Sequence, residues 1–458
     1  MGRSVAQRFE VGQGRLGWQA WVPALAAALV LLAWLPALAA PYQYDDFNTP
    51  VGDAASQSLA DWWRLLPHTL RPLTKLSYAL ESTLGADSAG ARRVLNALLF
   101  GGCVAWLKGL LEAADVPATL ALLLASVWAV HPVHAETVVA LAGRPVLLAM
   151  FFMLASAWSL VRGRANLALV SALLALFARE SALPWLLACA LLVAHERHVS
   201  VQRLIAAAVA ALGAGVLVLA SSSGVRRLVT SALSVTDAWD RLGLQWAAPT
   251  RGTWMLLTSP GAFTPDIEFA PSGMSRLALI LGTIVLYGAA LWLAYRYQRL
   301  RVFALLWLCF LLPQHSLIPK LDPLTARPFS ASLAPLLALA AVAIAPRLAR
   351  HPRLNAGASL VLAATFLLWF PLTRARAQLY RDPIALWRDA AERTERKLRP
   401  LVNLGTLLAH QHELSAAERA FERALQRDPT SFDVRLRLSA VRRLLLAQQT
   451  SESRDLVP

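Results

Sequence analysis

Charged residues are scarce in this chain of 458 residues, where Asp, Glu, Lys and Arg together make up only 16%. Soluble globular proteins carry about 25% charged residues, whereas here 57% of the residues are apolar and the mean hydropathy is +0.49. This composition excludes an ordinary soluble enzyme. Apolar runs of near-spanning length recur between Val22 and Phe370, so we expect lipid to surround most of the chain.

Cysteine is equally scarce, and Cys103, Cys189 and Cys309 all lie inside apolar runs. This placement excludes a disulfide framework and a cysteine-based zinc site, and such cysteines act as small apolar side chains. Most of the apolar runs also lack Asp, Glu, Lys and Arg in their interior. Proton-coupled transporters and pumps place such groups near the middle of the membrane. A lipid or sugar transporter is therefore disfavoured.

The basic excess is large, with a formal net charge of +16. Most of the arginines occupy short segments between apolar runs, and lysine is found only at positions 75, 108, 320 and 397. Short loops rich in Arg and Lys stay on the cytoplasmic side during membrane insertion. We therefore interpret these charges as topological anchors and expect no nucleic-acid partner. The preference for arginine favours a bacterial inner membrane.

Eleven membrane crossings are expected from the apolar runs. They cover residues 21–40, 92–111, 117–130, 145–161, 166–178, 182–194, 204–221, 276–294, 302–314, 331–346 and 357–371. The basic loops then place residues 1–20 in the cytoplasm and the C-terminus in the periplasm. The runs 166–178 and 182–194 are shorter than the roughly 20 residues that span a bilayer. We expect a hairpin there, with Arg179-Glu180 below the periplasmic surface and facing a protein-lined cavity.

The expected membrane domain over residues 21–372 has two long periplasmic loops, 41–91 and 222–275, and both contain amphipathic stretches with tryptophan. Helices of this kind lie in the membrane interface. We expect one such helix over 238–257 in place of a twelfth crossing. The predicted fold class is therefore all-α, a polytopic membrane protein with interfacial helices on its periplasmic side.

The composition becomes charged and helical beyond residue 372, with a connector over 373–397. A tetratricopeptide pattern of about 34 residues is matched at Leu401, Leu404, Gly405, Leu408, Ala417, Phe421, Ala424 and Pro429. We expect a short tetratricopeptide-repeat segment over 398–450. Because at least three repeats are needed for independent stability, this segment should rest on the membrane domain through residues 382–397.

Polar residues gather at the expected periplasmic ends of the crossings. Asp45 and Asp46 follow the first crossing, His131, His134 and Glu136 follow the third, and Lys320 and Arg327 lie between the ninth and the tenth. Ends of odd-numbered crossings share one face of the membrane. Carboxylates and imidazoles held together at a bilayer surface indicate a functional site.

These residue types suggest roles, each with an alternative. A carboxylate at the membrane rim can accept a proton from a hydroxyl or bind a metal, although Asp45-Asp46 also fits a helix cap or a turn. The spacing of His131 and His134 fits a metal, but Pro132 breaks the helix between them. We assign no metal ligands and no cofactor, and leave a divalent metal open. The planar fork of Arg327 suits a phosphate, with a lipid headgroup as the alternative partner.

Several motifs occur in a fixed order along the chain. They are Tyr44-Asp45-Asp46, Arg71-Pro72-Leu73-Thr74-Lys75-Leu76-Ser77-Tyr78, His131-Pro132-Val133-His134-Ala135-Glu136-Thr137-Val138, Gly143-Arg144, Arg179-Glu180-Ser181, Ser316-Leu317-Ile318-Pro319, Ala326-Arg327 and Ala385-Leu386-Trp387. In this order the chain resembles, over nearly its whole length, the membrane-embedded C-type glycosyltransferases that end in tetratricopeptide repeats. The animal members of this branch are the transmembrane and tetratricopeptide-repeat O-mannosyltransferases.

The resemblance implies a polyprenyl-phosphate sugar as donor, and transfer with inversion to a protein or glycolipid acceptor on the periplasmic face. It implies that Asp45, Asp46 and Glu136 are the catalytic carboxylates, with Asp45 as the base and Glu136 as a second acid that holds acceptor or sugar. Arg327, with Arg144 and His131, would then bind the donor phosphate. The substrate-binding residues expected beside them are His134, Arg71 and Glu180. The repeats would offer a groove to an acceptor or a partner.

A non-catalytic membrane scaffold that recruits partners through its repeats is the alternative. The two hypotheses differ in which residues matter. An enzyme depends on Asp45, Glu136 and Arg327, whereas a scaffold depends on the C-terminal repeats.

Overall fold

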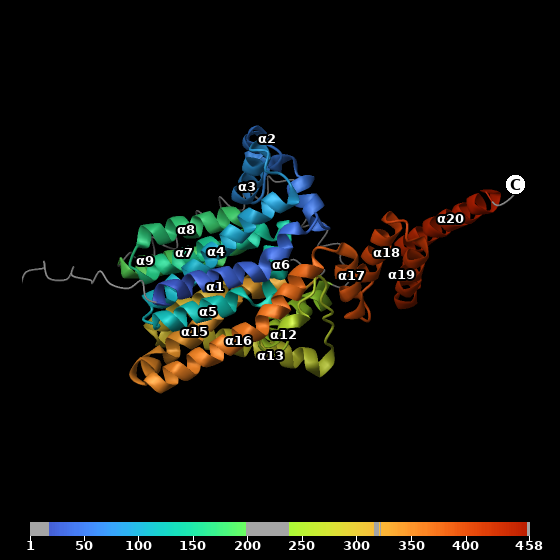
Figure 1. Cartoon of the computed structure of the whole chain (residues 1–458). Helices are drawn as coiled ribbons and strands as arrows, with labels where there is room; N and C mark the ends of the chain where they lie inside the picture. Colours follow the sequence, from blue (N-terminus) through green and yellow to red (C-terminus); the bar gives the residue numbers. More distant parts are fainter. Residues whose placement is uncertain (1–17, 198–237, 316–319, 321, 456–458) are drawn as a thin grey trace, which may run out of the picture.

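The structure is a computed structural model that describes residues 18–197, 238–315, 320 and 322–455. Within these ranges the chain forms helices and turns and no strand. The expected crossing over 204–221 lies outside the described residues, as do residues 1–17 of the expected cytoplasmic segment and the Ser316–Pro319 motif. The protein has a body of helices that run roughly side by side, and a smaller group of helices extends from one end of it (Figure 1).

The helices of the body correspond to the expected crossings. They are α1 (Trp18–Trp34), α4 (Ala89–Ala113), α5 (Ala118–Ala129), α7 (Arg144–Val161), α8 (Ala165–Ala178), α9 (Leu183–Glu196), α13 (Gly273–Arg296), α14 (Gln298–Leu311), α15 (Ala326–Arg350) and α16 (Pro352–Leu379). Their long apolar sequences explain the helices, because a backbone inside lipid must satisfy its own hydrogen bonds. Pro145 is the second residue of α7. Its missing N–H costs nothing there, because the N–H groups of the first turn have no partner within the helix.

The protein has membrane-spanning character, with five described helical segments long and apolar enough to cross a bilayer. These segments are Ala89–Ala113, Leu141–Val161, Gly273–Arg296, Ala326–Arg350 and Pro352–Leu379. A sixth is present if α5 and residues Pro132–Val138 form one span, which bends by 53° at the break. The prediction of eleven crossings is not confirmed, because other apolar helices are shorter than a span, among them Ala165–Ala178.

The helices α8 and α9 form the hairpin that their short apolar runs predict. Arg197 at the end of α9 donates a hydrogen bond to Asn166 Oδ1 near the start of α8, at 2.8 Å. The two outer ends of the hairpin are therefore adjacent, and Arg179 lies at its turn. The turn between α13 and α14 likewise meets the turn between α4 and α5, because Arg299 contacts Asp115 at 3.0 Å.

Helix α12 (Ala238–Thr258) covers the sequence expected to lie in the membrane interface. It is not among the helices long and apolar enough to span. It packs against α13, with Thr250 hydrogen-bonded to Thr283 at 2.9 Å and Arg276 paired with Asp240 at 2.5 Å. Gln245 is fully buried whereas Trp239 is 87% exposed, so α12 packs one face against the helical body and exposes another.

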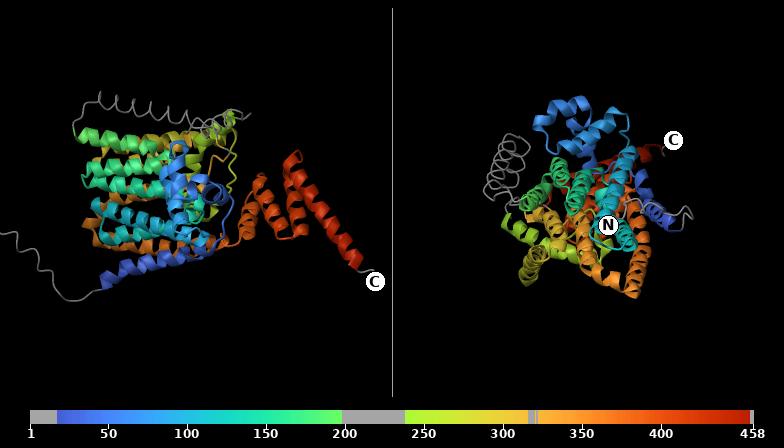
Figure 2. Two further views of the ribbon diagram at one scale, coloured as in Figure 1. Left: turned by 90° about the horizontal axis from the view of Figure 1, so that it is seen from above. Right: turned by 90° about the vertical axis from the view of Figure 1, so that its left-hand side faces the viewer.

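The segment between α1 and α4 folds into smaller helices. Helices α2 (Leu59–Leu65) and α3 (Pro72–Thr83) project from one side of the body (Figures 1 and 2). Ser58 caps α2 by accepting a hydrogen bond from the Asp61 N–H. Trp63 is 71% exposed on α2, which fits a side chain placed at a membrane interface.

The C-terminal helices form a separate unit. They are α17 (Pro383–Glu392), α18 (Arg399–His410), α19 (Leu414–Arg427) and α20 (Phe432–Asp455). Their apolar faces make a core of their own, distinct from the core of the body. Gly405 permits close packing of α18 on α19, because a Cβ atom there would lie 2.9 Å from the Phe421 ring. This unit extends from the end of the body at which α1 finishes and α16 leaves (Figure 2).

Candidate active site

Three side chains from distant parts of the sequence meet at that end of the body. Asp45 lies just after the first body helix, Glu136 lies in the short helix α6 (Ala135–Val138), and Arg327 lies in the first turn of α15. The Arg327 NH2 atom is 3.4 Å from Asp45 Oδ2, and its Nε atom is 2.8 Å from Glu136 Oε1. One guanidinium therefore joins two carboxylates that are far apart in sequence.

The two carboxylates differ in their access to solvent. The Asp45 side chain is 47% exposed, whereas that of Glu136 is 14% exposed. Glu136 Oε2 is enclosed and has no hydrogen-bond partner among the described residues. A buried polar atom without a partner is costly. This oxygen is therefore available to a group that enters the site.

A cavity of about 200 Å³ opens at these residues and is lined by Asp45, Asp46, Glu136 and Arg327. Tyr44 forms another wall and packs edge-on against Trp387 of α17, with ring centroids 5.7 Å apart. The Tyr44 backbone has a φ of +35°, a conformation that costs of order 1–3 kcal/mol and is found preferentially at functional sites. It turns the chain just before the two aspartates.

The C-terminal unit completes this cavity. Trp387 and Arg399 both line it, although they belong to α17 and α18. Arg399 is held in place by Asp322 at 2.7 Å and by Asp266 at 2.6 Å. Although burial alone would raise it, the pKa of Asp322 is lowered, chiefly by hydrogen bonds from Arg399 and Lys397. The cavity thus lies at the junction of the two units.

Asp46, expected beside Asp45 as a catalytic acid, has a different environment. Its side chain is fully buried and accepts hydrogen bonds from the backbone N–H groups of Ala142 at 2.9 Å and Gln43 at 3.1 Å. Arg93 lies 3.7 Å away. Burial raises the pKa of Asp46, against the opposing effect of these contacts. Although Asp46 borders the cavity, its oxygens connect two chain segments, which is a structural role.

Arg144, expected at the donor phosphate, lies outside the lining of the cavity and is completely buried. It donates hydrogen bonds to Asn96 Oδ1 at 2.8 Å, Glu81 Oε2 at 2.7 Å and the Arg92 carbonyl at 2.7 Å. Its guanidinium also lies over the Tyr78 ring, 4.2 Å from the centroid. These partners already occupy the groups that would bind a phosphate.

The two histidines are also held by internal contacts and line no part of the cavity. His131 accepts a hydrogen bond from the Val133 N–H through Nδ1, and its Nε2 lies 3.0 Å from the Leu256 carbonyl. The ring nitrogens of His134 lie 2.7 Å from the Ser330 hydroxyl and 2.8 Å from a backbone carbonyl at the end of α5. The contacts of both rings are therefore made inside the protein, away from the cavity at which a phosphate and a substrate were expected.

Arg71 and Glu180, expected as substrate-binding residues, pair with each other. Two parallel contacts of 2.8 and 2.6 Å join the Arg71 guanidinium to the Glu180 carboxylate. Although burial alone would raise it, the bonds from Arg71 lower the pKa of Glu180 to about 2. The pair connects α3 to the turn of the α8–α9 hairpin and lies outside the lining of the cavity.

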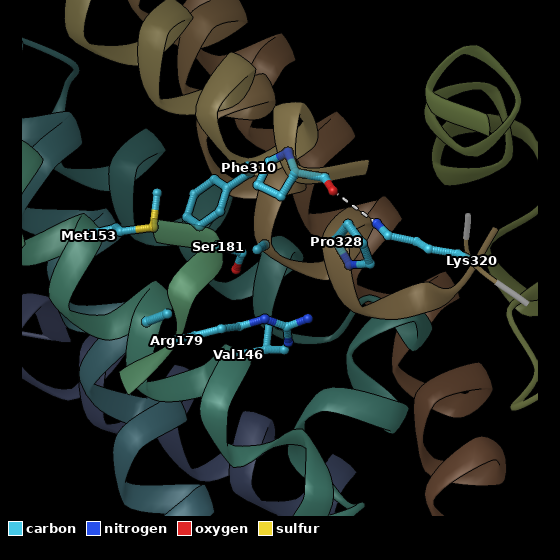
Figure 3. Close-up of a pocket in the computed structure, with 10 residues that line it drawn as sticks. Val146, Met153, Arg179, Ser181, Phe310, Lys320 and Pro328 are labelled. Carbon is cyan, nitrogen blue, oxygen red and sulfur yellow. Dashed lines mark hydrogen bonds between the residues drawn. The ribbon is translucent and has the colours of Figure 1, made fainter. Parts of the chain in front are cut away.

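A second, smaller cavity is lined by Pro328, the residue after Arg327. None of the residues that line it was among the predicted site residues. It has a volume of about 60 Å³ and is lined by Arg179, Ser181, Lys320 and Pro328 together with apolar side chains (Figure 3). The sequence did carry a signal for it. Arg179 was expected to face a protein-lined cavity, and Lys320 to lie on the periplasmic side.

No group of three or more His, Cys, Asp or Glu side chains placed to hold a metal is found in the described part of the chain. No protein-family model, curated protein or solved structure matches the sequence or the fold. The geometry of these two cavities therefore carries the functional argument.

Proposed function

We propose that this protein is a membrane glycosyltransferase that moves a sugar from a polyprenyl-phosphate carrier to a hydroxyl of a protein or glycolipid acceptor. The observation that carries the proposal is the cavity in which Asp45, half exposed, is held beside Arg327 and the enclosed carboxylate of Glu136. Such a transfer needs a base for the acceptor hydroxyl and a second polar group that holds the sugar or the acceptor, and this cavity offers a carboxylate for each role.

The proposed reaction is one inverting displacement. The acceptor oxygen bonds to the anomeric carbon while its proton passes to the Asp45 carboxylate. The bond between the anomeric carbon and the phosphate oxygen breaks, and its electron pair leaves on the phosphate. Glu136, through its unpartnered Oε2 atom, would accept a hydrogen bond from a hydroxyl of the sugar or the acceptor. Tyr44 and Trp387 provide an aromatic wall beside them.

The topology that we propose places the cavity on the periplasmic face of a bacterial inner membrane. In this arrangement the N-terminus is cytoplasmic, the eleven apolar runs all enter the bilayer, and residues 398–450 form a short tetratricopeptide-repeat segment in the periplasm. The separation of α17–α20 from the opposite end of the body supports this arrangement (Figure 2). A bound divalent metal is not required by the proposed displacement.

The test is the substitution Asp45→Asn, which keeps the size of the side chain and removes its basicity. Membranes that contain the variant should transfer sugar from a polyprenyl-phosphate donor about 10²–10⁴-fold more slowly, the usual contribution of a general base. Asp87→Asn is the matched control, because Asp87 is exposed in the same loop region and lies outside the cavity. Full activity of Asp45→Asn at equal protein level would remove Asp45 as the base.

A scaffold that recruits partners through the C-terminal unit is the second candidate. The observation that favours it is the exposed apolar face of α20, where Phe432 is 75% and Leu436 is 53% exposed. Paired substitutions separate the two functions. Phe432→Ser with Leu436→Ser should abolish a scaffold function and leave glycosyl transfer intact, whereas Asp45→Asn should have the opposite effect.

A further inference from the structure

The charge of Arg327 is already matched inside the protein. One carboxylate lies 3.4 Å from it and another 2.8 Å. A phosphate brought to this guanidinium would meet the negative charges of Asp45 and Glu136 at close range, and like charges at such distances repel. Arg327 is therefore better suited to orient the two acids than to receive the phosphate of a donor.

Arg179 has the opposite character. Its side chain makes no hydrogen bond or ion pair with the described residues, and its Nε atom is enclosed. Burial, and then repulsion by Arg71, lowers the pKa of Arg179 to about 10, so it remains a cation at neutral pH. A partly buried cation without a partner is costly for the fold. An unpaired cation of this kind is expected at a binding site, because a bound anion offsets the cost.

The small cavity gives that anion a place. The Arg179 guanidinium lies on one side of it and Lys320 on another, with Lys320 Nζ directed to the Pro313 carbonyl at 2.9 Å (Figure 3). The cavity volume is about 60 Å³. On the same scale a single water molecule occupies roughly 10–15 Å³, so the cavity has room for several waters. The space thus admits a group of the size of phosphate.

Apart from Ser181, the remaining walls of the cavity are apolar and include Val146, Met153 and Phe310 from α7 and α14. Apolar walls make no favourable contact with a free inorganic phosphate, whereas they can pack against the hydrocarbon chain of a lipid phosphate. Pro328 lines this cavity and its neighbour Arg327 lines the larger one. Consecutive residues in the first turn of α15 thus line the two cavities, and the proposed bond between a phosphate and a sugar would lie near this turn.

We propose that Arg179 and Lys320 bind the phosphate group of a lipid phosphate, while Arg327 positions the two acids in the neighbouring cavity. The assignment of this lipid as the sugar donor rests on the proposed function. When the bond to the sugar breaks, the phosphate gains negative charge, and the two cations stabilise that charge on the leaving group.

Binding of lipid by the full chain tests the proposal directly, without any transfer reaction. Purified protein in a neutral detergent is titrated with undecaprenyl phosphate, undecaprenol, inorganic phosphate and phosphatidylglycerol, and binding is followed by native mass spectrometry. Undecaprenyl phosphate should bind at least tenfold more tightly than each of the other three. Arg179→Gln and Lys320→Gln should each weaken it about tenfold or more, as expected for contacts to a charged group.

The control is Arg64→Gln, since the Arg64 side chain is 73% exposed on α2 and pairs with Asp61 in the same helix. It should bind undecaprenyl phosphate as the unmodified protein does. Unchanged binding in both cavity variants, or equally tight binding of phosphatidylglycerol, would overturn the proposal.

Thermal unfolding without lipid separates a binding role from a structural one. Arg179→Gln should melt at the same temperature or higher, because the substitution removes an unpartnered cation. A lower melting temperature would show that Arg179 stabilises the fold, which would contradict the proposal. Lys320→Gln provides the binding result independently of any effect of Arg179 on folding.

The outcomes for the site and for the enzyme are distinguishable. Asp45→Asn should bind undecaprenyl phosphate normally and fail in transfer. If Asp45→Asn retains transfer, the proposed base is wrong and the phosphate site stands. If Asp45→Asn loses transfer while Arg179→Gln and Lys320→Gln bind normally, the phosphate site is wrong and the enzyme stands.

Discussion

Two clusters of charged side chains lie near the same end of the helical body and differ in how completely they are paired. The first, which we call the sealed cluster, consists of Arg144, Glu81, Asn96, Arg93 and Asp46. Arg144 is fully buried, and the Arg144–Glu81 contact is 2.7 Å long. Most of the polar atoms of this cluster contact one another or the backbone, although one Glu81 oxygen lacks a hydrogen bond.

The second, the open cluster, consists of Asp45, Glu136, Arg327, Arg179 and Lys320. It borders both cavities, and among the described residues Glu136 Oε2 and Arg179 Nε have no hydrogen-bond partner. The sealed cluster joins helices, whereas the open cluster keeps capacity for a ligand. Under the proposed function, the open cluster is the one that carries the chemistry.

Substitution of Arg144 should have the largest effect on stability. Arg144→Met leaves the Glu81 carboxylate buried without its main partner, and breaking a buried pair in this way costs about 3–5 kcal/mol. Thermal unfolding of the purified full chain measures the loss. Arg64→Met removes an exposed pair and should cost about 0–1 kcal/mol. Equal melting of the two variants would mean that the sealed cluster does not hold the helices together.

The adjacent aspartates offer a sharper comparison, because one belongs to each cluster. In the unmodified protein each carboxylate oxygen of Asp46 accepts one backbone hydrogen bond, from Gln43 or from Ala142. In Asp46→Asn one oxygen is replaced by an NH2 group, which then faces one of these N–H donors. An unsatisfied buried group costs about 1–3 kcal/mol. Asp46→Asn should therefore lower the melting temperature, whereas Asp45→Asn should leave it unchanged and reduce transfer. The reverse pattern would exchange the roles of the two residues.

The smallest expected effect is a pH dependence confined to the open cluster. Burial, and then the charge of Arg179, lowers the pKa of Lys320 to about 8. Lys320 is a cation below this pH and neutral above it, so the affinity for undecaprenyl phosphate should fall several-fold as the pH rises from 7 to 9. The titration of the phosphate contributes little to this decline, because its second pKa is about 6. Arg179 stays charged over the same range. Lys320→Gln should bind more weakly and show no such decline.

Much of this arrangement follows from sequence pattern. Apolar runs predicted where the body helices lie, and counting crossings predicted that Asp45, Glu136 and Arg327 share one face. The structure places these three within contact distance. The number of crossings cannot be predicted from the apolar runs alone, because runs such as 166–178 give helices shorter than a span. Their position relative to lipid depends on the neighbours that cover them.

The roles of single polar residues were harder to predict. An arginine at the end of a crossing looks the same in sequence whether it faces a cavity or a buried partner. Arg144 meets Glu81, which lies 63 positions away, and no local pattern shows that contact. Trp387 and Arg399 escaped prediction as lining residues for a related reason, since they reach the cavity only through docking of the C-terminal unit.

The wall that α17 contributes to the larger cavity has a consequence for biosynthesis. Helices α1 to α16 emerge from the ribosome first and can insert into the membrane before α17 exists. At that stage the cavity lacks Trp387 and Arg399, and its mouth is open on one side. The cavity is therefore complete only after the last helices have docked. Under the proposed topology and function, a truncated or incompletely exported chain would be inserted but inactive.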